Sequence, residues 1–385
     1  MLTRDHFHQC LKYLALFVSA FAVVFIFLPA TFDLHGINYR FDFTTILVGN
    51  SVLLAVLWSA YVLSALNKSQ QRVRATVIQT NSTINAYEIN AKFAISAFLS
   101  LTSLFLFYAI SGVAMLNAGA EFERVALKAG NGEYLILGTA FAYVTIGYVE
   151  ESYTIIKKAV SLTLLTLLAF SGFKTPFLIG LIILFAPREM RNIFAWRYLF
   201  LTSGIFVLVA FYDSWRLDST TLNLIDTWMW KLAIPLYNSS YVLEFVAAYQ
   251  SGIGSLIARD VSAFVGDGPF SGAWIHSQMP GLGAVESISV PIAAEGFANF
   301  RAPGFIIYPI CLIIVAAALS YLPEITKVDG RAWAFLVSFI LAKCTISGFF
   351  LSMIFTLGPV VLALLIVNAT WTLFSRSKFL HRGHR

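Results

Sequence analysis

The chain has 385 residues, of which 58% are hydrophobic and 12% are charged, whereas roughly a quarter of the residues in an ordinary soluble domain are charged. This composition excludes a soluble enzyme. The mean hydropathy of +0.77 and the 15% share of aromatic residues are typical of chains whose solvent is lipid, so a multi-span inner-membrane protein is the starting point. In such a protein the net charge of +6 bears on membrane orientation and gives no reason to expect a nucleic-acid partner.

Apolar runs that could cross a bilayer recur along the chain, because a spanning helix needs about 20 mostly apolar residues. The first run follows Arg4 and Lys12 and lacks a small-residue cleavage site, so we expect it to be a retained span. The clear candidates are residues 12–30, 46–66, 93–116, 134–149, 197–212 and 303–323.

Two further segments carry polar or turn-forming residues near their middle and predict helical hairpins. They are 158–187, centred on Ser171 to Pro176, and 332–374, with Lys343 to Gly348 inside it. The arms of the first hairpin have only about 13 residues, so its tip at Lys174 should lie below the outer membrane surface. The prediction is an all-α polytopic protein with about ten spans, seven within 1–212 and three within 303–385, a segment that ends in a basic tail.

The distribution of Lys and Arg predicts the orientation. If the N terminus is cytoplasmic, 17 of the 26 basic residues fall on inside segments, and the positive-inside rule then places both termini in the cytoplasm. The nine outside residues are Arg40, Arg124, Lys128, Lys174, Arg216, Lys231, Arg259, Arg301 and Lys343.

Residues 213–302 form a long external segment between the seventh and eighth spans. A connection of this length inside a compact protein is usually functional. It contains two helix-like stretches, 220–233 and 237–251, followed by a stretch rich in Gly and turn residues from Gly252 to Gly283. We expect a small folded periplasmic cap with amphipathic helices at the interface. Its aromatic residues could stack on sugar rings or form an interfacial belt.

Most signatures of soluble catalysis are absent. The sequence has no GxxxxGK[ST], HExxH, CxxC, GxSxG or DxD motif, which argues against an ATP-driven pump and against a metal-dependent transferase that faces the cytosol. The three cysteines, Cys10, Cys311 and Cys344, lie in or beside apolar runs and suggest neither a disulfide framework nor a zinc site. We expect no metal and no cofactor.

Basic residues stand where lipid-exposed charge is costly. Lys174 and Lys343 lie between apolar arms, Arg301 begins the eighth span, and Arg259 lies in the cap. Such residues usually face a polar cavity, and a cluster of them would suit a pyrophosphate, which Arg can bind with a bidentate fork. The competing interpretation is snorkelling at the interface, or ion pairs with the acidic residues of the cap.

Two residues are candidates for the general base. His276 can change charge near neutral pH, although a lone His is more often structural. Glu295, six residues before Arg301, is the second candidate; on a continuous helix the two would lie near one another without stacking.

Three stretches resemble the Wzy-type O-antigen and oligosaccharide repeat-unit polymerases of the bacterial inner membrane. Phe170 to Pro176 is similar to the family's Ser-Gly-x-Arg-[Ser/Thr] tip, with Lys174 in place of Arg. Gly266 to Gly272, leading into Gln278 to Leu282, resembles the Tyr-Gly and Pro-Arg segments of its large loop. Ala293 to Gly304 is similar to its Glu-x-Tyr-x-Asn-Phe-Gly-x-x-Gly pattern, with Phe297 in place of Tyr and Arg301 in place of Gly.

The resemblance implies a metal-independent, lipid-linked glycosyltransferase with a GT-C-like membrane fold. Such enzymes transfer a growing glycan from undecaprenyl pyrophosphate onto a lipid-linked repeat unit at the periplasmic face, with a flippase and a chain-length regulator as partners. On this hypothesis His276 and Glu295 are catalytic, and Lys174, Arg259, Arg301 and Lys343 bind pyrophosphate.

Three alternatives remain open at this stage. An O-antigen ligase would transfer the glycan to the lipid A core with the same chemistry. A flippase or transporter of lipid-linked sugars would more often show repeated halves and broken helices, and we find no internal repeat. A purely structural membrane partner would leave the lysines between apolar arms unexplained.

Overall fold

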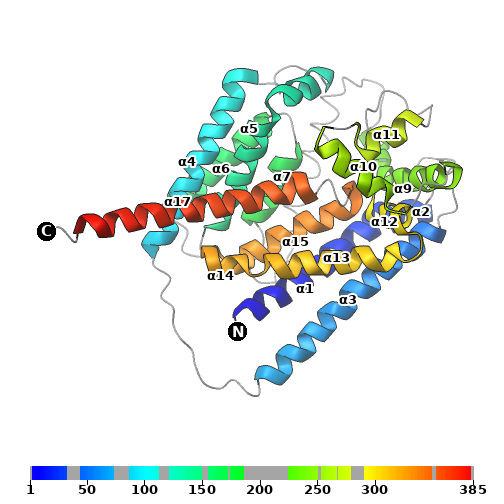
Figure 1. Cartoon of the computed structure of the whole chain (residues 1–385), viewed down its shortest axis with the longest axis horizontal. Coiled ribbons are helices and arrows are strands. Elements are labelled where there is room, and N and C mark those ends of the chain that lie inside the picture. Colours follow the sequence, from blue (N-terminus) through cyan, green and yellow to red (C-terminus); the bar gives the residue numbers. More distant parts are fainter. Residues whose placement is uncertain are drawn as a thin grey trace.

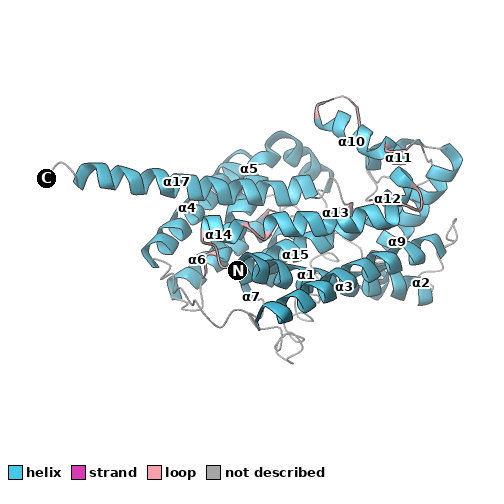
Figure 2. Cartoon of the chain, turned by 60° about the horizontal axis from the view of Figure 1, so that its bottom comes forward, coloured by secondary structure: helices cyan, strands magenta, loops and turns pink. Residues whose placement is uncertain are grey.

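The computed structural model describes residues 2–32, 44–72, 86–111, 121–149, 155–171, 174–185, 224–249, 253–266, 268–278, 290–348 and 353–382. All regular structure within these ranges is helical (Figures 1 and 2). In lipid every backbone N–H and C=O must be bonded within the protein, and a helix meets that demand within one segment. The expected all-α class is confirmed for the described residues.

Six helical segments of the described chain are long and apolar enough to cross a membrane: Asp5–Thr31, Thr44–Leu66, Tyr87–Ser111, Gly304–Thr326, Gly330–Ser347 and Met353–Ser375. The first comprises α1 (Leu2–Ala22), a π-helical turn η1 (Val23–Phe27) and α2 (Leu28–Phe32). The others lie in α3 (Thr44–Arg72), α4 (Ala86–Ser111), α13 (Gly304–Leu319) with α14 (Leu322–Thr326), α15 (Gly330–Ser347), and η4 (Met353–Leu357) with α17 (Gly358–Arg382). The protein is a multi-pass helical membrane protein.

Three helices occupy the positions of other predicted spans. Residues 134–149 lie mostly in α5 (Glu121–Gly147), and 158–187 corresponds to α6 (Ile155–Phe170) and α7 (Lys174–Phe185), which pack against each other. These three are not among the six segments above. The predicted span 197–212 lies outside the described residues.

The main core lies where α1, α4, α5, α13, α15 and α17 meet. Tyr13 and Phe17 of α1 pack edge-on against Phe335 of α15, and Ser338 donates a hydrogen bond to the Cys10 carbonyl, 2.8 Å away. On the other side of the core, Gly180 allows α7 to approach α6, because a Cβ there would lie 2.2 Å from the Leu165 side chain.

Four helices form a cap at one end of the bundle, beside α2 (Figure 1). They are α9 (Leu224–Tyr249), α10 (Ser255–Phe264), α11 (Ser271–Gln278) and α12 (Ile292–Phe300). The N-terminal end of α1 and the C-terminal end of α17 both lie away from this cap, and the C-terminal end of α17 forms the opposite end of the molecule (Figures 1 and 2).

The cap differs from the sequence expectation in one element. The stretches 220–233 and 237–251 are not separate helices, because α9 runs through Pro235 without a break. Proline removes one backbone donor from a helix. Here Ala233 and Leu236 on either side are fully buried, and this packing outweighs the missing hydrogen bond.

Candidate functional site

The cap joins the membrane bundle at a tight turn, residues Glu295 to Gly304, which we call the elbow. Helix α12 ends at Phe300, and Arg301 takes φ 58° and ψ −146° before α13 begins at Gly304. This backbone region is almost restricted to glycine. The two helices then meet backbone to backbone, since a Cβ on Gly304 would lie only 1.9 Å from the Gly296 carbonyl oxygen.

A buried carboxylate lies at the start of the elbow. The side chain of Glu295 is 4% exposed, and its Oε1 accepts a hydrogen bond of 3.1 Å from the Tyr308 hydroxyl of α13. Asn299 Nδ2 donates to the Tyr308 oxygen at 2.9 Å and to the Glu295 carbonyl at 3.0 Å. The three side chains therefore form one continuous network between α12 and α13.

Asn299 also connects this network to the cap. Its Oδ1 accepts hydrogen bonds of 3.1 Å from the backbone N–H groups of Leu256 and Ile257. These are first-turn donors of α10, which have no partner within the helix, so Asn299 supplies the missing cap from a distant segment. The backbone N–H of Gly254 adds a hydrogen bond of 2.7 Å to the Asn299 carbonyl.

Both predicted arginines of this region lie over aromatic rings. The Arg259 guanidinium of α10 is 3.8 Å from the ring centroid of Trp274 in α11, and Trp274 in turn packs edge-on against Phe245 of α9. Arg301 lies over Phe297, 5.7 Å from its centroid. A ring face attracts a guanidinium and orients its plane.

The predicted helical relation between Glu295 and Arg301 does not apply, because α12 ends between them. Arg301 follows the last residue of α12 and has the backbone conformation, usual for glycine, that is described above. Its backbone N–H bonds to the Phe297 carbonyl at 2.8 Å, so the residue also closes the last turn of α12.

Asp260 belongs to the competing interpretation, in which cap carboxylates pair with the cations. It is buried, and its Oδ1 accepts a hydrogen bond of 2.7 Å from the Ser271 N–H, which begins α11. Burial raises the pKa of Asp260, while the bonds from Ser271 and the charge of Arg259 oppose that shift. Arg259 therefore has an electrostatic partner in the cap as well as an aromatic one.

The other predicted cations come from neighbouring helices. Lys343 is half-buried in α15, which packs against α12. Lys174 begins α7, which contacts α15, and His276 lies in α11, which contacts α10. The side chains of Lys174 and His276 lie outside the described residues. The six predicted residues thus lie on or beside five helices, each of which contacts at least one other of the five: α7, α15, α12, α10 and α11.

Sequence reasoning missed two members of the elbow network, Asn299 and Tyr308. Asn299 lies four residues after Glu295 on α12, a spacing that places side chains on one face of a helix, so this signal was present. Tyr308 follows the turn by several residues and reaches Glu295 only because Gly296 and Gly304 touch. Within the described ranges, no group of three His, Cys, Asp or Glu side chains could hold a metal ion.

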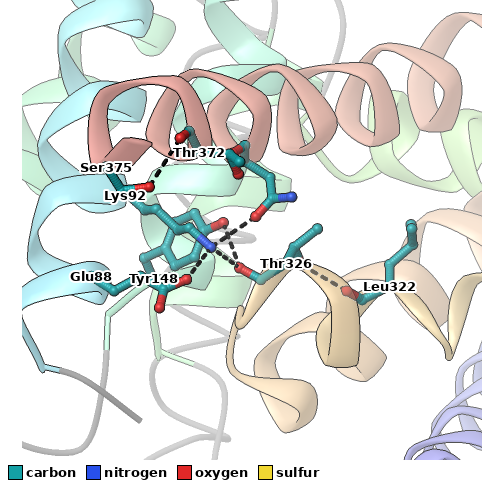
Figure 3. Close-up of polar contacts among 8 residues, drawn as sticks. Glu88, Lys92, Tyr148, Leu322, Thr326, Thr372 and Ser375 are labelled. Carbon is teal, nitrogen blue, oxygen red and sulfur yellow. Dashed lines mark hydrogen bonds and ion pairs between the residues drawn. The ribbon is translucent and has the colours of Figure 1, made fainter. Parts of the chain in front are cut away.

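A second buried charge cluster lies away from the cap, and the sequence did not single it out (Figure 3). Lys92 of α4 is 1% exposed. Its Nζ bonds to Glu88 Oε1 at 2.6 Å, to the Thr326 carbonyl at 2.8 Å and to Asn368 Oδ1 at 2.8 Å. Tyr148 donates to the same Thr326 carbonyl at 3.3 Å. We call Glu88, Lys92, Tyr148, Thr326 and Asn368 the lysine cluster.

The lysine cluster accounts for every donor of its cation. An ammonium group has three N–H donors, and the three acceptors come from α4, α14 and α17. The arrangement joins helices that are far apart in the sequence, so its evident role is structural. Comparisons of the chain with protein-family models, with curated proteins and with solved structures give no match.

Proposed function

We propose that the protein is a membrane-embedded glycosyltransferase that polymerises lipid-linked oligosaccharide repeat units, as the O-antigen polymerases do. The observation that carries the proposal is the buried carboxylate of Glu295, held by Tyr308 and Asn299 within a turn that also bears Arg301. An ionisable group that is buried in a membrane protein is costly to keep, and is by default a candidate for function.

The reaction forms one bond and breaks one. An acceptor sugar hydroxyl attacks the anomeric carbon of the donor glycan, the bond from that carbon to pyrophosphate breaks, and the hydroxyl proton passes to a base. We assign the base role to Glu295 first, because its carboxylate is buried and bonded to Tyr308, and His276 of α11 is the second candidate. General-base catalysis of this kind typically contributes a factor of about 10²–10⁴ in rate.

Cationic side chains stabilise the departing undecaprenyl pyrophosphate in this proposal. Arg301 and Arg259 are fixed over Phe297 and Trp274, so little reorganisation is needed when negative charge develops. Lys343 and Lys174 add positive charge from α15 and α7. No metal or other cofactor enters any step, and the substrates are two lipid carriers with their glycans.

We further propose that the cap faces the periplasm and both termini face the cytoplasm of a bacterial inner membrane. The positive-inside rule supports this orientation. Exposed Lys327 directly follows α14, at the end where Lys92 is buried and away from the cap. The proposal retains the finer architecture of ten spans in a GT-C-like arrangement, with a flippase and a chain-length regulator as partners.

The first test is a polymerisation assay with purified protein and an undecaprenyl-pyrophosphate-linked repeat unit. Glu295→Gln keeps an acceptor for Tyr308 and removes the basic carboxylate, so we expect the rate to fall by about 10²–10⁴-fold. Glu324→Gln, at a half-buried carboxylate of α14, is the matched control and should retain the rate. A fully active Glu295→Gln protein would contradict the proposed role of the elbow.

A deletion strain separates the polymerase from its alternatives. Loss of a polymerase leaves single repeat units on the lipid A core, whereas loss of a ligase leaves none. Loss of a flippase leaves repeat units on the cytoplasmic leaflet. Lipopolysaccharide gels, together with extraction of the lipid-linked units, distinguish the three outcomes.

A further inference from the structure

The exposed face of α10 is apolar, as in a helix that contacts lipid. Ala258 and Val261 share one face of α10 by their spacing, and Val265 is the residue that directly follows the helix. Val261 is 50% exposed and Val265 is 78% exposed, and Ile253 in the preceding turn is 81% exposed. The opposite face holds Leu256 and the carboxylate of Asp260, both buried. A helix in water shows the reverse pattern, with its polar residues outward.

The buried position of Asp260 has its own explanation. Its carboxylate bonds to the N–H of Ser271 at the start of α11, and the Ser271 hydroxyl donates to the Leu256 carbonyl at 2.8 Å. These contacts require the polar side of α10 to face the cap. The aliphatic side is therefore turned outward, where it forms a charge-free surface of the kind that marks an interaction site.

The flanks of α10 are attached to helices that span the membrane. On its N-terminal side, the Gly254 N–H bonds to the Asn299 carbonyl in the elbow, just before the span Gly304–Thr326. On its C-terminal side, Phe270 packs edge-on against Phe355, with ring centroids 5.9 Å apart, in the first turn of the span Met353–Ser375. Helix α10 therefore lies at the level where two spans begin.

The chain that follows α10 contacts a span with exposed apolar side chains, because Phe270 packs against Phe355. Phe355 is 43% exposed on η4, and further along the same span Leu362 is 51% exposed. Figure 2 shows α10 and the turn after it projecting from the side of the cap. Since the neighbouring exposed surface meets acyl chains, the occupant most consistent with this position and composition is the hydrocarbon of the same leaflet.

We infer that α10 is an interfacial helix, with Ile253, Val261 and Val265 inserted among the acyl chains of the leaflet on the cap side. Such helices lie about 5–10 Å into the boundary between headgroups and acyl chains. The cap is then anchored in the membrane as well as attached to the bundle, and the elbow lies next to the lipid phase. The inference concerns the position of α10 and holds whatever reaction the elbow performs.

The test places an environment-sensitive fluorophore on introduced cysteines in the full chain, with the half-buried Cys311 replaced by Ser and the buried Cys10 and Cys344 retained. Val261→Cys and Val265→Cys report the proposed lipid face, Leu362→Cys is the lipid-facing reference, and Ser277→Cys is an exposed polar position on α11. The protein is reconstituted into phosphatidylcholine vesicles that contain a lipid with a nitroxide near the start of its acyl chain, and aqueous iodide is added separately.

We expect the labels at Val261 and Val265 to lose emission to the nitroxide lipid, as the Leu362 label does, and to resist iodide. Emission from the Ser277 label should fall with iodide. Quenching of the Val261 and Val265 labels by iodide alone places the face in water and overturns the inference. Resistance to both quenchers means that protein covers the face, as in a second copy of the chain, and also overturns it. A label at Ile253 repeats the measurement outside the helix if a valine variant fails to fold.

Discussion

Two buried charge clusters lie at different places in this molecule and differ in the backbone conformation beside them. In the lysine cluster, the three donors of Lys92 meet three acceptors from α4, α14 and α17. In the elbow, Glu295 and Asn299 are bonded to Tyr308, while the next charged residue, Arg301, occupies a backbone conformation that suits glycine. Both clusters bury charge and lie beside a non-glycine residue with positive φ. Lys327, next to Thr326, takes ψ 24°, the left-handed helical region that other residues also enter, whereas the ψ of −146° at Arg301 belongs to a region almost restricted to glycine.

The difference separates a structural role from a functional one. A fully bonded cation joins helices and gains nothing from binding a further group, because it has no donor left to offer. A residue held in a sparsely populated conformation costs about 1–3 kcal/mol and persists where the surrounding structure enforces it, which happens often at functional sites. The lysine cluster therefore fixes the bundle, and the elbow is the better candidate for chemistry.

The largest expected effect is the loss of the lysine cluster. Lys92→Ala leaves Glu88 without its cation and removes one donor each from Asn368 Oδ1 and from the Thr326 carbonyl, which keeps only its bond from Tyr148. This change should lower the free energy of unfolding by about 3–5 kcal/mol. The measurement is thermal unfolding of the purified protein in detergent. Lys158→Ala, at an exposed lysine of α6, should leave the midpoint nearly unchanged. Equal midpoints for the two variants would contradict the structural role of Lys92.

The next effect concerns the contact that shapes the elbow. Gly304→Ala places a Cβ 1.9 Å from the Gly296 carbonyl oxygen, and overpacking of this kind costs about 1–3 kcal/mol. The matched control is Gly358→Ala at the start of α17, where a Cβ meets nothing within 4 Å. Its helix propensity gain should leave the protein as stable or slightly more stable. Indistinguishable unfolding midpoints would show that α12 and α13 do not meet at these glycines.

A smaller effect tests how the elbow holds the cap. Asn299→Ala removes the side-chain oxygen that caps α10, and the loss of a cap costs about 0.5–2 kcal/mol. Asn299→Asp keeps that oxygen and removes the amide that donates to Tyr308. Hydrogen exchange at the Leu256 and Ile257 amides should accelerate in the first variant and much less in the second. Equal exchange in both would argue against Asn299 as the cap.

The smallest effect is the pH dependence of the cap. Because burial raises the pKa of Asp260 above its ordinary value, the folded state holds this proton more tightly than the unfolded state does. Stability should therefore fall as pH rises from the ordinary aspartate pKa to the raised one, and level off above it. Asp260→Asn retains an acceptor for Ser271 and should abolish this slope, with a change at neutral pH of under about 1 kcal/mol.

The membrane helices were predictable because their signal is local. A run of about 20 apolar residues identifies a span without knowledge of any neighbour, and six of the predicted spans coincide with apolar helices. The division of the cap into stretches 220–233 and 237–251 was wrong, because α9 runs through Pro235 and the residues on either side of it are buried. Whether a helix continues through a proline depends on tertiary packing, which the local sequence pattern does not specify.

The site was predictable only in part. Glu295 and Arg301 stood out as charged residues beside an apolar run, whereas the conformation of Arg301 and the reach of Tyr308 depend on the contact between Gly296 and Gly304. Lys92 was treated only as one of the cytoplasmic basic residues. Its ion pair with Glu88 could have been predicted, because Glu88 lies four positions before it, a spacing that favours an ion pair on a helix. That the same lysine also meets Thr326 and Asn368 follows from helix packing alone.

Arg301→Gly tests the central claim most directly, because glycine is at ease in the backbone conformation that arginine holds under strain. The variant should fold at least as well as the parent protein, and its rate of joining lipid-linked repeat units should fall by about 10²–10³-fold, as expected when one preorganised charge stabiliser is removed. A well-folded Arg301→Gly protein that extends glycan chains at the parental rate would contradict the account.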